Sequence, residues 1–341
     1  MKELRFALIG AGFWASYHMG GWGEVAGARC VAVYNRTRAK AEQVAQRFGI
    51  GRVYDDPREM LAKEPLDFVD CITDVDTHSR FVHLSAAHKL PVICQKPLGP
   101  SLEVAREMAA ACRRAGVPLL VHENWRWQTP LRQLKQVLDQ GTIGRVFRAR
   151  IQYANSFPVF DNQPFLKELD QFLLTDMGTH ILDVARFLFG EVSTVYARTH
   201  QVHTDIRGED MATVLLGMAG GATVTCEISY ATRMEHERFP QTFVFVEGAL
   251  GSVELATDYW LRTTTAAGTF ACRYPPPRYA WADPAYDVVH ASIVPCHADL
   301  LAALQGVKPA ETTAEDNLKT LALVFAAYES ARTRQAVELS Q

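Results

Sequence analysis

An aspartate and a histidine four residues apart could carry out acid–base chemistry. Asp176 and His180 fall within residues 172–188, which we expect to form one helix with both side chains on the same face. A carboxylate beside an imidazole fixes its tautomer and raises its basicity, which suits a general base. Asp183 could extend this face, and a metal held by the histidine and both aspartates is the rival interpretation. Because no further histidine or cysteine stands at ligand spacing, we predict no metal. A structural role for Asp176, as an acid in the first helical turn, also stays open.

A lysine is the second candidate group. Lys96 precedes Pro97 and follows a short apolar run at residues 91–94. If that run is a strand of a doubly wound sheet, its carboxyl end faces the ligand crevice, so the lysine points towards a substrate. Lys96 could then hydrogen-bond a reacting hydroxyl and stabilise a developing alkoxide. A surface lysine before a proline turn fits the sequence equally well.

A glycine-rich turn near the N-terminus predicts nucleotide binding. Residues 10–15 read Gly-Ala-Gly-Phe-Trp-Ala, a G-x-G-x-x-A pattern between a predicted strand at 4–9 and a predicted helix at 13–25. The first glycine makes a tight turn, the second lets the backbone approach a pyrophosphate, and the small third residue allows close packing. The helix N-terminus then offers free N–H groups to the phosphates.

The end of the next predicted strand leaves the choice between NAD and NADP open. The strand at 30–34 is not followed by an acidic residue, which would bind the ribose hydroxyls and repel a 2′-phosphate. Asn35 can hydrogen-bond a hydroxyl but repels nothing. The cations that follow are Arg36, Arg38 and Lys40, and they could attract a phosphate or simply face solvent.

The elements that must position these residues divide the chain into two parts. In the first third, short apolar runs alternate with helical segments, which is typical of βαβ units and a parallel sheet. Long β-rich runs at 146–153, 212–231 and 243–255 then predict an antiparallel sheet with helices on one face. We therefore predict an α/β fold with a Rossmann dinucleotide-binding domain over residues 1–123. A C-terminal α+β domain with a large, open, mainly antiparallel sheet would occupy 124–341. The remaining helices are expected at 38–48, 77–87, 102–115, 130–140, 296–304 and 314–332.

Composition excludes several classes of protein. The 341 residues, 48% hydrophobic and 21% charged, are enough for two domains whose cores need neither disulfides nor a structural metal. A net charge of −3 gives no electrostatic footprint for nucleic acid or anionic membrane. No run approaches the roughly 18 apolar residues of a membrane span. Seven scattered cysteines without a CxxC pair fit a reducing compartment. We therefore expect a cytoplasmic protein without nucleic-acid or membrane partners.

These pieces, in this order, resemble the glucose–fructose oxidoreductase / inositol dehydrogenase / rhizopine-catabolism (Gfo/Idh/MocA) family over essentially the whole chain. Residues 73–78 are similar to the family's T-P-N-x-x-H turn, and 95–97 to its E-K-P motif. Residues 124–130 resemble the N-x-R-x-x-x-P segment that opens the second domain. Residues 176–183 resemble the D-x-G-x-H-x-x-D helix, and 313–316 the start of the terminal helix.

The resemblance implies hydride transfer between a substrate carbon and the nicotinamide. His180, oriented by Asp176, would take the hydroxyl proton, and Lys96 would position and polarise that oxygen. Motif and resemblance assign to the cofactor Gly10, Gly12, Phe13, Trp14, Asn35, Arg36, Thr73, Asp74, His78, Gln95, Lys96 and Asn124. The residues assigned to the substrate are Lys96, Trp125, Arg126, Asn155, Asp176 and His180. The resemblance also implies a homodimer or homotetramer formed through the open sheet, and a Lys96–Pro97 bond that is often cis.

The sequence departs from the family pattern at three places near this site. Gln95 replaces the usual Glu, which removes a negative charge beside Lys96, so the division of the base role between Lys96 and His180 stays open. Asp74 replaces Pro in the loop over the cofactor, and Leu173-Leu174 stands near the position of the usual Gly-Gly.

The predicted function is an NAD(P)-dependent dehydrogenase acting on a hydroxyl of a sugar or polyol. Oxidation of a cyclic aldose such as apiose to its lactone is one form of it. One alternative is a glycoside hydrolase that uses tightly held NAD transiently; such family members often carry export signals, and none is visible. Another is a non-catalytic nucleotide-binding sensor. Sensors tend to lose the lysine or the histidine, whereas Lys96, Asp176 and His180 are all present.

Overall fold

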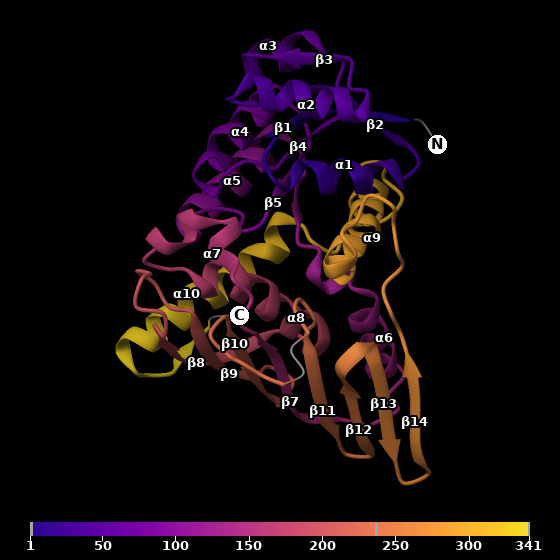
Figure 1. The fold of residues 1–341 in the computed structure, drawn as a ribbon, viewed down its shortest axis with the longest axis vertical. Coiled ribbons are helices and arrows are strands. Elements are labelled where there is room, and N and C mark those ends of the chain that lie inside the picture. The colour runs from indigo at the N-terminus through magenta and orange to yellow at the C-terminus, as the bar shows by residue number, and fades with distance from the viewer. Residues whose placement is uncertain (1–2, 236–237, 340–341) are drawn as a thin grey trace. The chain divides into compact units, whose positions relative to one another are not determined.

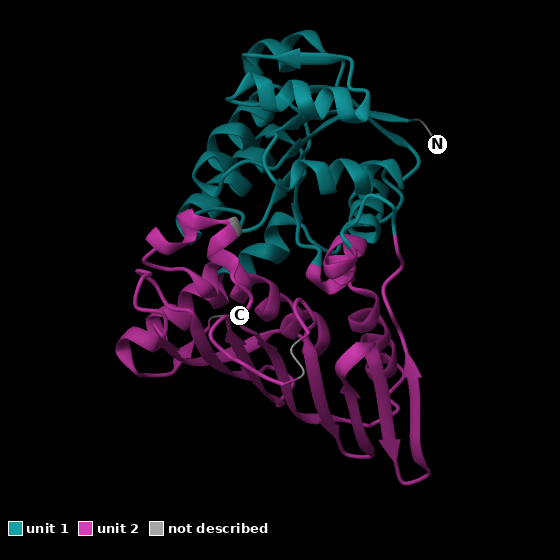
Figure 2. Ribbon diagram, in the orientation of Figure 1, with its two compact units in different colours: residues 1–124, 279–283, 293–321 teal, residues 125–278, 284–292, 322–341 magenta. Residues whose placement is uncertain are grey.

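The computed structural model describes residues 3–235 and 238–339, and the chain divides into two compact units (Figures 1 and 2). The first unit contains residues 1–124 together with 279–283 and 293–321. The second unit contains residues 125–278, 284–292 and 322–341. The first long segment ends within one residue of the predicted boundary at 123/124, and two later segments, 279–283 and 293–321, return to the first unit.

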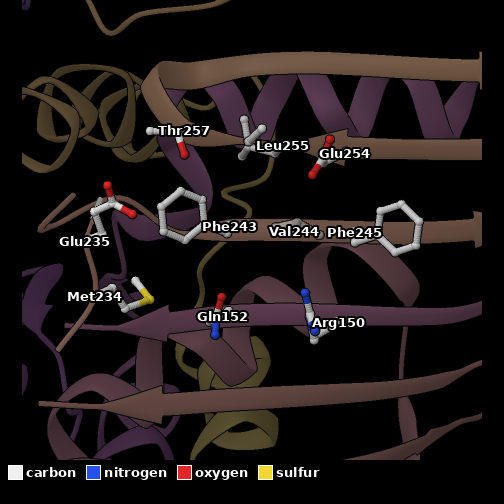
Figure 3. A pocket seen from close by; sticks show the side chains of 11 residues that line it. Arg150, Gln152, Met234, Glu235, Phe243, Val244, Phe245, Glu254, Leu255 and Thr257 are labelled. Atoms are coloured by element: carbon white, nitrogen blue, oxygen red, sulfur yellow. The ribbon is translucent and has the colours of Figure 1, made fainter. Parts of the chain in front are cut away.

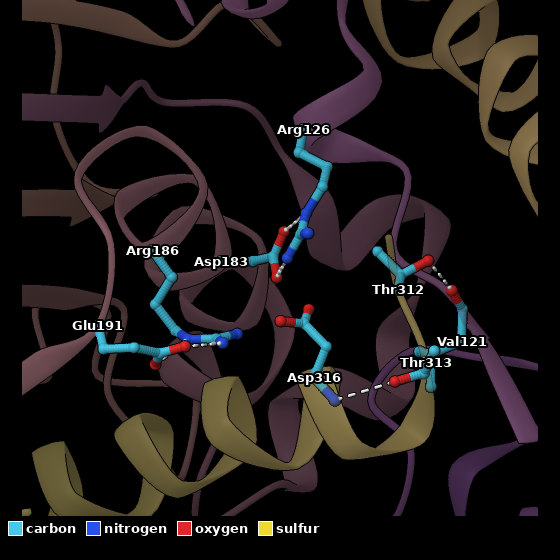
Figure 4. A network of polar contacts seen from close by, with 8 residues as sticks. All are labelled: Val121, Arg126, Asp183, Arg186, Glu191, Thr312, Thr313 and Asp316. Atoms are coloured by element: carbon cyan, nitrogen blue, oxygen red, sulfur yellow. Dashed lines mark hydrogen bonds and ion pairs between the residues drawn. The ribbon is translucent and has the colours of Figure 1, made fainter. Parts of the chain in front are cut away.

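Hydrogen bonds to the last strand of the first unit explain why residues 312–313 belong to that unit. The Val121 N–H donates to the Thr312 carbonyl over 2.8 Å, and the Thr312 hydroxyl donates back to the Val121 carbonyl over 2.7 Å (Figure 4). Leu120 and Thr313 form an antiparallel bridge beside them. These bonds attach residues 312–313 to the sheet edge, so sequence distance does not decide which unit they join.

The first unit is a six-stranded sheet in the order β3-β2-β1-β4-β5-β6, with every pair parallel. This confirms the predicted Rossmann architecture. Its strands are β1 (Leu4–Ile9), β2 (Ala28–Tyr34), β3 (Arg52–Tyr54), β4 (Phe68–Cys71), β5 (Val92–Gln95) and β6 (Leu119–His122). The helices between them are α1 (Ala15–Gly23), α2 (Arg38–Phe48), α3 (Pro57–Lys63), α4 (Val75–Ala87) and α5 (Leu102–Ala115). The sequence missed β3 and α3, because three and seven residues are too short for a periodic signal.

The second unit is built on a nine-stranded sheet in the order β14-β13-β12-β11-β7-β10-β9-β8-β15. Among the strands that the structure describes, only the β7–β10 pair of this sheet is parallel, so the sheet is mixed and mainly antiparallel, as predicted. The hairpins at Gly220-Gly221 and 248–251 form as expected. The strands are β7 (Val146–Ala154), β8 (Val192–His200), β9 (Met211–Met218), β10 (Thr223–Ser229), β11 (Phe243–Gly248), β12 (Gly251–Leu255), β13 (Trp260–Thr265), β14 (Gly268–Arg273) and β15 (Val337–Glu338).

One face of this sheet is buried and the other is open. Helix α8 (Thr179–Phe189) packs against β7 and β10. Along β7, Ala149, Ile151 and Tyr153 are buried, while Arg150 between the first two is exposed, as the period of two requires. Helix α8 therefore packs on the buried face of the sheet, and the opposite face is open.

The remaining long helices are α6 (Thr129–Asp139), α9 (Asp287–Leu304) and α10 (Ala314–Thr333). Helix α9 begins earlier than the predicted 296, because Pro295 lies inside it and reads as a helix breaker in the sequence. Among the described residues, 284–304 form one helix long and apolar enough to cross a membrane by length and composition. Within the protein 67% of that stretch is buried, as in the core helix of a globular protein.

Candidate active site

The turn between β1 and α1 has the backbone of a phosphate-binding loop. Gly10 has φ +111°, and a Cβ there would lie 2.8 Å from the Ile72 carbonyl oxygen, so only glycine fits. A Cβ on Gly12 would meet nothing within 4 Å, which leaves that backbone open to a ligand. Phe13 is 63% exposed beside Gly12 and packs edge-on against Trp14, the residue before α1. The loop therefore fits a dinucleotide pyrophosphate.

Asn35 holds this turn from the end of β2. Its Oδ1 accepts the Ala11 N–H over 2.9 Å, and its Nδ2 donates to the Thr37 carbonyl over 3.0 Å. The structure thus places the residue that we predicted for the ribose in a bond that shapes the glycine turn itself.

The three cations after β2 differ in their surroundings. Arg38 donates to Glu42 over 2.7 Å and also pairs with Asp55, and these two carboxylates raise its pKa. Arg36 and Lys40 are exposed. Arg36 and Lys40 are therefore better placed than Arg38 to bind a phosphate at this end of β2, because the Arg38 guanidinium is already paired with carboxylates.

His78 joins the loop after β4 to the segment after β5. Its Nε2 lies 3.0 Å from the Thr73 carbonyl, and its Nδ1 lies 3.2 and 3.3 Å from the carbonyls of Pro97 and Leu98. Burial lowers the pKa of His78, against the carbonyl contacts that raise it. The ring is thus surrounded by backbone and holds the loop that carries Thr73 and the exposed Asp74.

Lys96 directly follows β5, and its peptide bond to Pro97 is cis, which the resemblance implied. Its N–H donates to the Gln95 side-chain oxygen over 2.7 Å. The Gln95 amide nitrogen in turn lies 3.1 Å from a ring nitrogen of His18, a residue that the sequence did not single out. Asn124, two residues after β6, is buried at the end of the first segment.

In the second unit, Asp176 and His180 do not share one regular α-helix. Asp176 lies in a π-helical turn, Leu174–Gly178, that continues into α8, where His180 is the second residue. The Glu209 carboxylate accepts the Leu174 N–H over 3.0 Å and so anchors the start of this turn. The predicted helix 172–188 is corrected in this respect. Single π turns inside helices occur frequently at functional sites.

The His180 imidazole is held by an aromatic neighbour. It stacks on Trp125, with ring centroids 4.3 Å apart and an interplanar angle of 24°, and only 4% of the residue is exposed. The Trp125 Nε1–H donates to the Thr242 hydroxyl over 3.0 Å. Trp125, which we predicted as a substrate contact, therefore fixes the plane of the imidazole.

Two buried tyrosines, missed by the sequence reasoning, accompany Asp176. The hydroxyls of Tyr153 and Tyr230 hydrogen-bond each other, and Tyr153 also bonds Asn155. Burial raises the pKa of both phenols, and the Asp176 charge raises it further, so both stay protonated. The alternation along β7 places Tyr153 on the covered face, which was the available signal.

Arg126 forms a buried ion pair. Its Nε lies 2.7 Å from Asp183 Oδ2 and its Nη2 lies 2.5 Å from Oδ1, a bidentate arrangement (Figure 4). The pair joins the short turn Trp125–Trp127 to α8. The structure thus places Arg126, a predicted substrate contact, where it holds Trp125 beside His180.

A pocket on the second unit contains none of the predicted site residues. Figure 3 shows its lining from β7 and β11, with Arg150, Gln152 and Phe245 among the side chains. These three lie on the open face of the sheet, since they alternate with buried neighbours. The pocket is therefore a feature of the open face and not of the α8 side.

Comparison with known proteins agrees with this arrangement. Residues 4–123 match the oxidoreductase family with an NAD-binding Rossmann fold, and residues 131–254 match the GFO/IDH/MocA C-terminal domain. The chain is similar to D-apiose dehydrogenases from Paraburkholderia graminis (43% identity, 99% of this chain and 90% of that protein) and Rhizobium rhizogenes (41%, 99% and 98%). It also superimposes, with a TM-score of 0.97, on an oxidoreductase from Agrobacterium radiobacter in complex with NAD⁺, L-tartaric acid and magnesium. That protein is 41% identical, and the match covers 99% of this chain and 98% of that one.

Proposed function

Because the chain belongs to the GFO/IDH/MocA family of NAD(P)-dependent oxidoreductases, we propose that it oxidises D-apiose, with NAD as the cofactor. The observation that carries the substrate is 43% and 41% identity to two D-apiose dehydrogenases over 99% of this chain. The choice of NAD is supported by the similar oxidoreductase from Agrobacterium radiobacter, whose structure contains NAD⁺. The product would be the lactone, because oxidation of a cyclic aldose at its anomeric carbon removes the C–H hydrogen as hydride and the O–H hydrogen as a proton.

The residues of this chain divide the reaction between them. The nicotinamide, when bound, supplies the hydride acceptor. His180 takes the hydroxyl proton on a ring nitrogen, and stacking on Trp125 fixes the plane from which it does so. Lys96 donates a hydrogen bond to the same oxygen, which stabilises the charge that develops there. Gly10 and Gly12 allow the backbone to approach the pyrophosphate.

We expect the enzyme to work in the cytoplasm as a homo-oligomer. All seven cysteines are free thiols, which suits a reducing compartment. The open face of the nine-stranded sheet carries exposed apolar side chains, among them Leu215 and Phe245. Apolar side chains on one uncovered face favour contact with a second copy.

The experiment is a spectrophotometric assay at the nicotinamide band near 340 nm. Purified protein is mixed with NAD or NADP and with D-apiose, other aldoses, inositols and sugar acids. Reduction of NAD that is fastest with D-apiose is the expected result. Faster turnover with an inositol would overturn the substrate, and faster turnover with NADP would overturn the cofactor. A dinucleotide retained through purification without reduction by any sugar would favour the hydrolase or the sensor.

A further inference from the structure

A chain of hydrogen bonds leads from Lys96 into the core of the first unit. The Lys96 N–H donates to Gln95 Oε1 over 2.7 Å, and Gln95 Nε2 lies 3.1 Å from His18 Nε2. His18 Nδ1 lies 3.2 Å from Asp70 Oδ2, and the Trp22 indole N–H donates to the same oxygen over 2.8 Å. His18 and Asp70 are completely buried. The chain therefore links a predicted active-site lysine to a carboxylate in the middle of the sheet.

The Lys96 N–H at one end of this series of hydrogen bonds determines which atom donates and which atom accepts in each of them. A backbone N–H can only donate, so the Gln95 atom that faces Lys96 is the oxygen, and the amide NH₂ faces His18. His18 Nε2 must then accept, which puts the ring proton on Nδ1, where it donates to the Asp70 carboxylate. One neutral tautomer of His18 thus satisfies all the bonds.

We propose that Asp70 and His18 are positioning residues, which act through Gln95 to hold the backbone of Lys96 in place for catalysis. This inference rests on the proposed function, because it assigns Lys96 its role in the dehydrogenase reaction. A side chain on a loop is aimed reproducibly only if its backbone is fixed, and small misplacements of reacting groups are costly in rate. Both ring nitrogens of His18 are paired in this buried network, which restrains the ring and the Gln95 side chain.

Two further buried histidines lie beside His18. The rings of His122 and His297 lie 4.2 and 5.1 Å from its ring, and His297 stacks on Trp22 at 3.9 Å. Burial and the two neighbouring histidines keep the pKa of His297 well below its usual range. The titratable side chains beside His18 in the described part of the chain thus include His122 and His297, with Asp70 as its carboxylate partner.

A metal ion is the competing explanation for these three histidines, whose ligand atoms lie within 4.8 Å of one another. A tetrahedral zinc with bonds of about 2.05 Å would bring the nitrogens to roughly 3.4 Å and would need a lone pair from each. Both ring nitrogens of His18 already have partners, Gln95 and Asp70. Metal binding would therefore break a hydrogen bond of His18 to Gln95 or to Asp70. The test below includes metal binding as a result that would contradict the proposal.

The neutral Gln95 amide leads to a specific prediction for the variant Gln95→Glu. In Gln95→Glu, one carboxylate oxygen would still accept the Lys96 N–H, but the other would face His18 Nε2. His18 would then need a second proton, between the new carboxylate and Asp70. We expect the activity of Gln95→Glu to fall as the pH is raised, because that proton is lost, while the wild type shows no such step.

The test combines kinetics with a readout of the proton itself. His18→Leu removes both bonds, and we expect kcat for the sugar to fall roughly 10- to 100-fold with an unchanged Kd for the dinucleotide. His18→Gln, whose oxygen can accept from Gln95, should recover part of that loss. The matched control is His297→Phe, a buried histidine of the same cluster with no bond to the chain, which should keep kcat within about twofold.

Nitrogen-15 spectra of the histidine-labelled full-length protein report the tautomer without requiring activity. A neutral His18 with its proton on Nδ1 is expected. A proton on Nε2, an imidazolium at neutral pH, or an unchanged kcat in His18→Leu would overturn the proposal. So would one zinc per chain that is lost in His18→Leu. If no sugar is oxidised, the proposed function fails, while the tautomer still decides whether the chain of bonds exists.

Discussion

At the scale of single residues, the two proposed reacting groups are held in different ways. His180 has its ring plane fixed by Trp125, and the bidentate Arg126–Asp183 pair holds the segment that carries Trp125. Lys96 has a long side chain, and its backbone N–H is bound by Gln95. The imidazole is therefore immobilised directly and the lysine through its main chain, which suits a base and a flexible hydrogen-bond donor respectively.

Removing either group should strongly reduce turnover while leaving the affinity for the dinucleotide unchanged. We expect Lys96→Ala and His180→Ala each to lower kcat by about 10²- to 10⁴-fold, the range for loss of positioned acid–base catalysis. Dinucleotide affinity, measured by quenching of tryptophan fluorescence, should stay near the wild-type value. The controls are the exposed pair Lys63→Ala and His88→Ala, which should be fully active. Wild-type rates in both site variants would show that the proposed site is wrong.

At the scale of elements, the glycine turn shows two different requirements for glycine. Gly10 is required by the fold, since its φ of +111° and the Ile72 carbonyl at 2.8 Å leave no room for a Cβ. Gly12 is not, since a Cβ there would point into open space. Glycine at position 12 serves only to let a ligand approach the backbone.

Substitution of the two glycines should therefore separate stability from binding. Gly10→Ala is expected to lower the free energy of unfolding by about 1–3 kcal/mol, because it combines backbone strain with a clash. Gly12→Ala should leave the melting temperature unchanged and weaken dinucleotide binding at least several-fold. Thermal melts with and without NAD measure both effects. An unchanged NAD affinity in Gly12→Ala would mean that the pyrophosphate does not lie on this turn.

At the scale of the whole molecule, the open face of the nine-stranded sheet is a surface whose composition depends on the strand registers. The strand registers place one row of side chains across it: Tyr196, Leu215, Thr225, Arg150, Phe245 and Glu254. Leu215 and Phe245 are 42% and 38% exposed. A row that combines aromatic and aliphatic side chains with an arginine on an open face suits self-association.

We expect Leu215→Glu to reduce the oligomer to a smaller species, because it places a charge in the row that would be covered. Light scattering after size-exclusion chromatography measures the mass directly. Val307→Glu, an equally drastic change at an exposed residue that is not part of this sheet, should leave the mass unaltered. A wild-type protein that is already monomeric would overturn the expected oligomer.

Two buried histidines should make the stability of the protein depend on pH. Burial lowers the pKa of His78 and His297, so in the folded state both remain neutral when unfolded histidines, with an ordinary pKa of about 6.5, take up protons. Stability is thus complete above pH 6.5 and is lost as the pH falls below it, by up to about 1.4 kcal/mol per pH unit for each histidine.

Urea unfolding between pH 5 and 7.5 measures this slope. His297→Phe removes one of these groups while keeping a ring against Trp22, so its slope should be smaller than that of the wild type by up to about 1.4 kcal/mol per pH unit. Equal slopes in the two proteins would show that His297 is not buried as a neutral group.

The sequence by itself determined the family, the Rossmann half and the mainly antiparallel second sheet, because these depend on local patterns. A glycine turn after a strand, the Lys96-Pro97 dipeptide and the Asp176…His180 spacing are each complete within a few residues. Helices α2 and α5 match their predicted bounds because glycines end both.

Only the tertiary structure decided what depends on residues far apart in the chain. Arg126 meets Asp183, and the Gln95 side chain turns towards His18 and Asp70. Residues 293–321 join the first unit although most of the chain before them belongs to the second. Such pairings depend on which buried groups satisfy one another's hydrogen bonds and charges, and that choice is made across the packed core, where distance along the sequence carries no information.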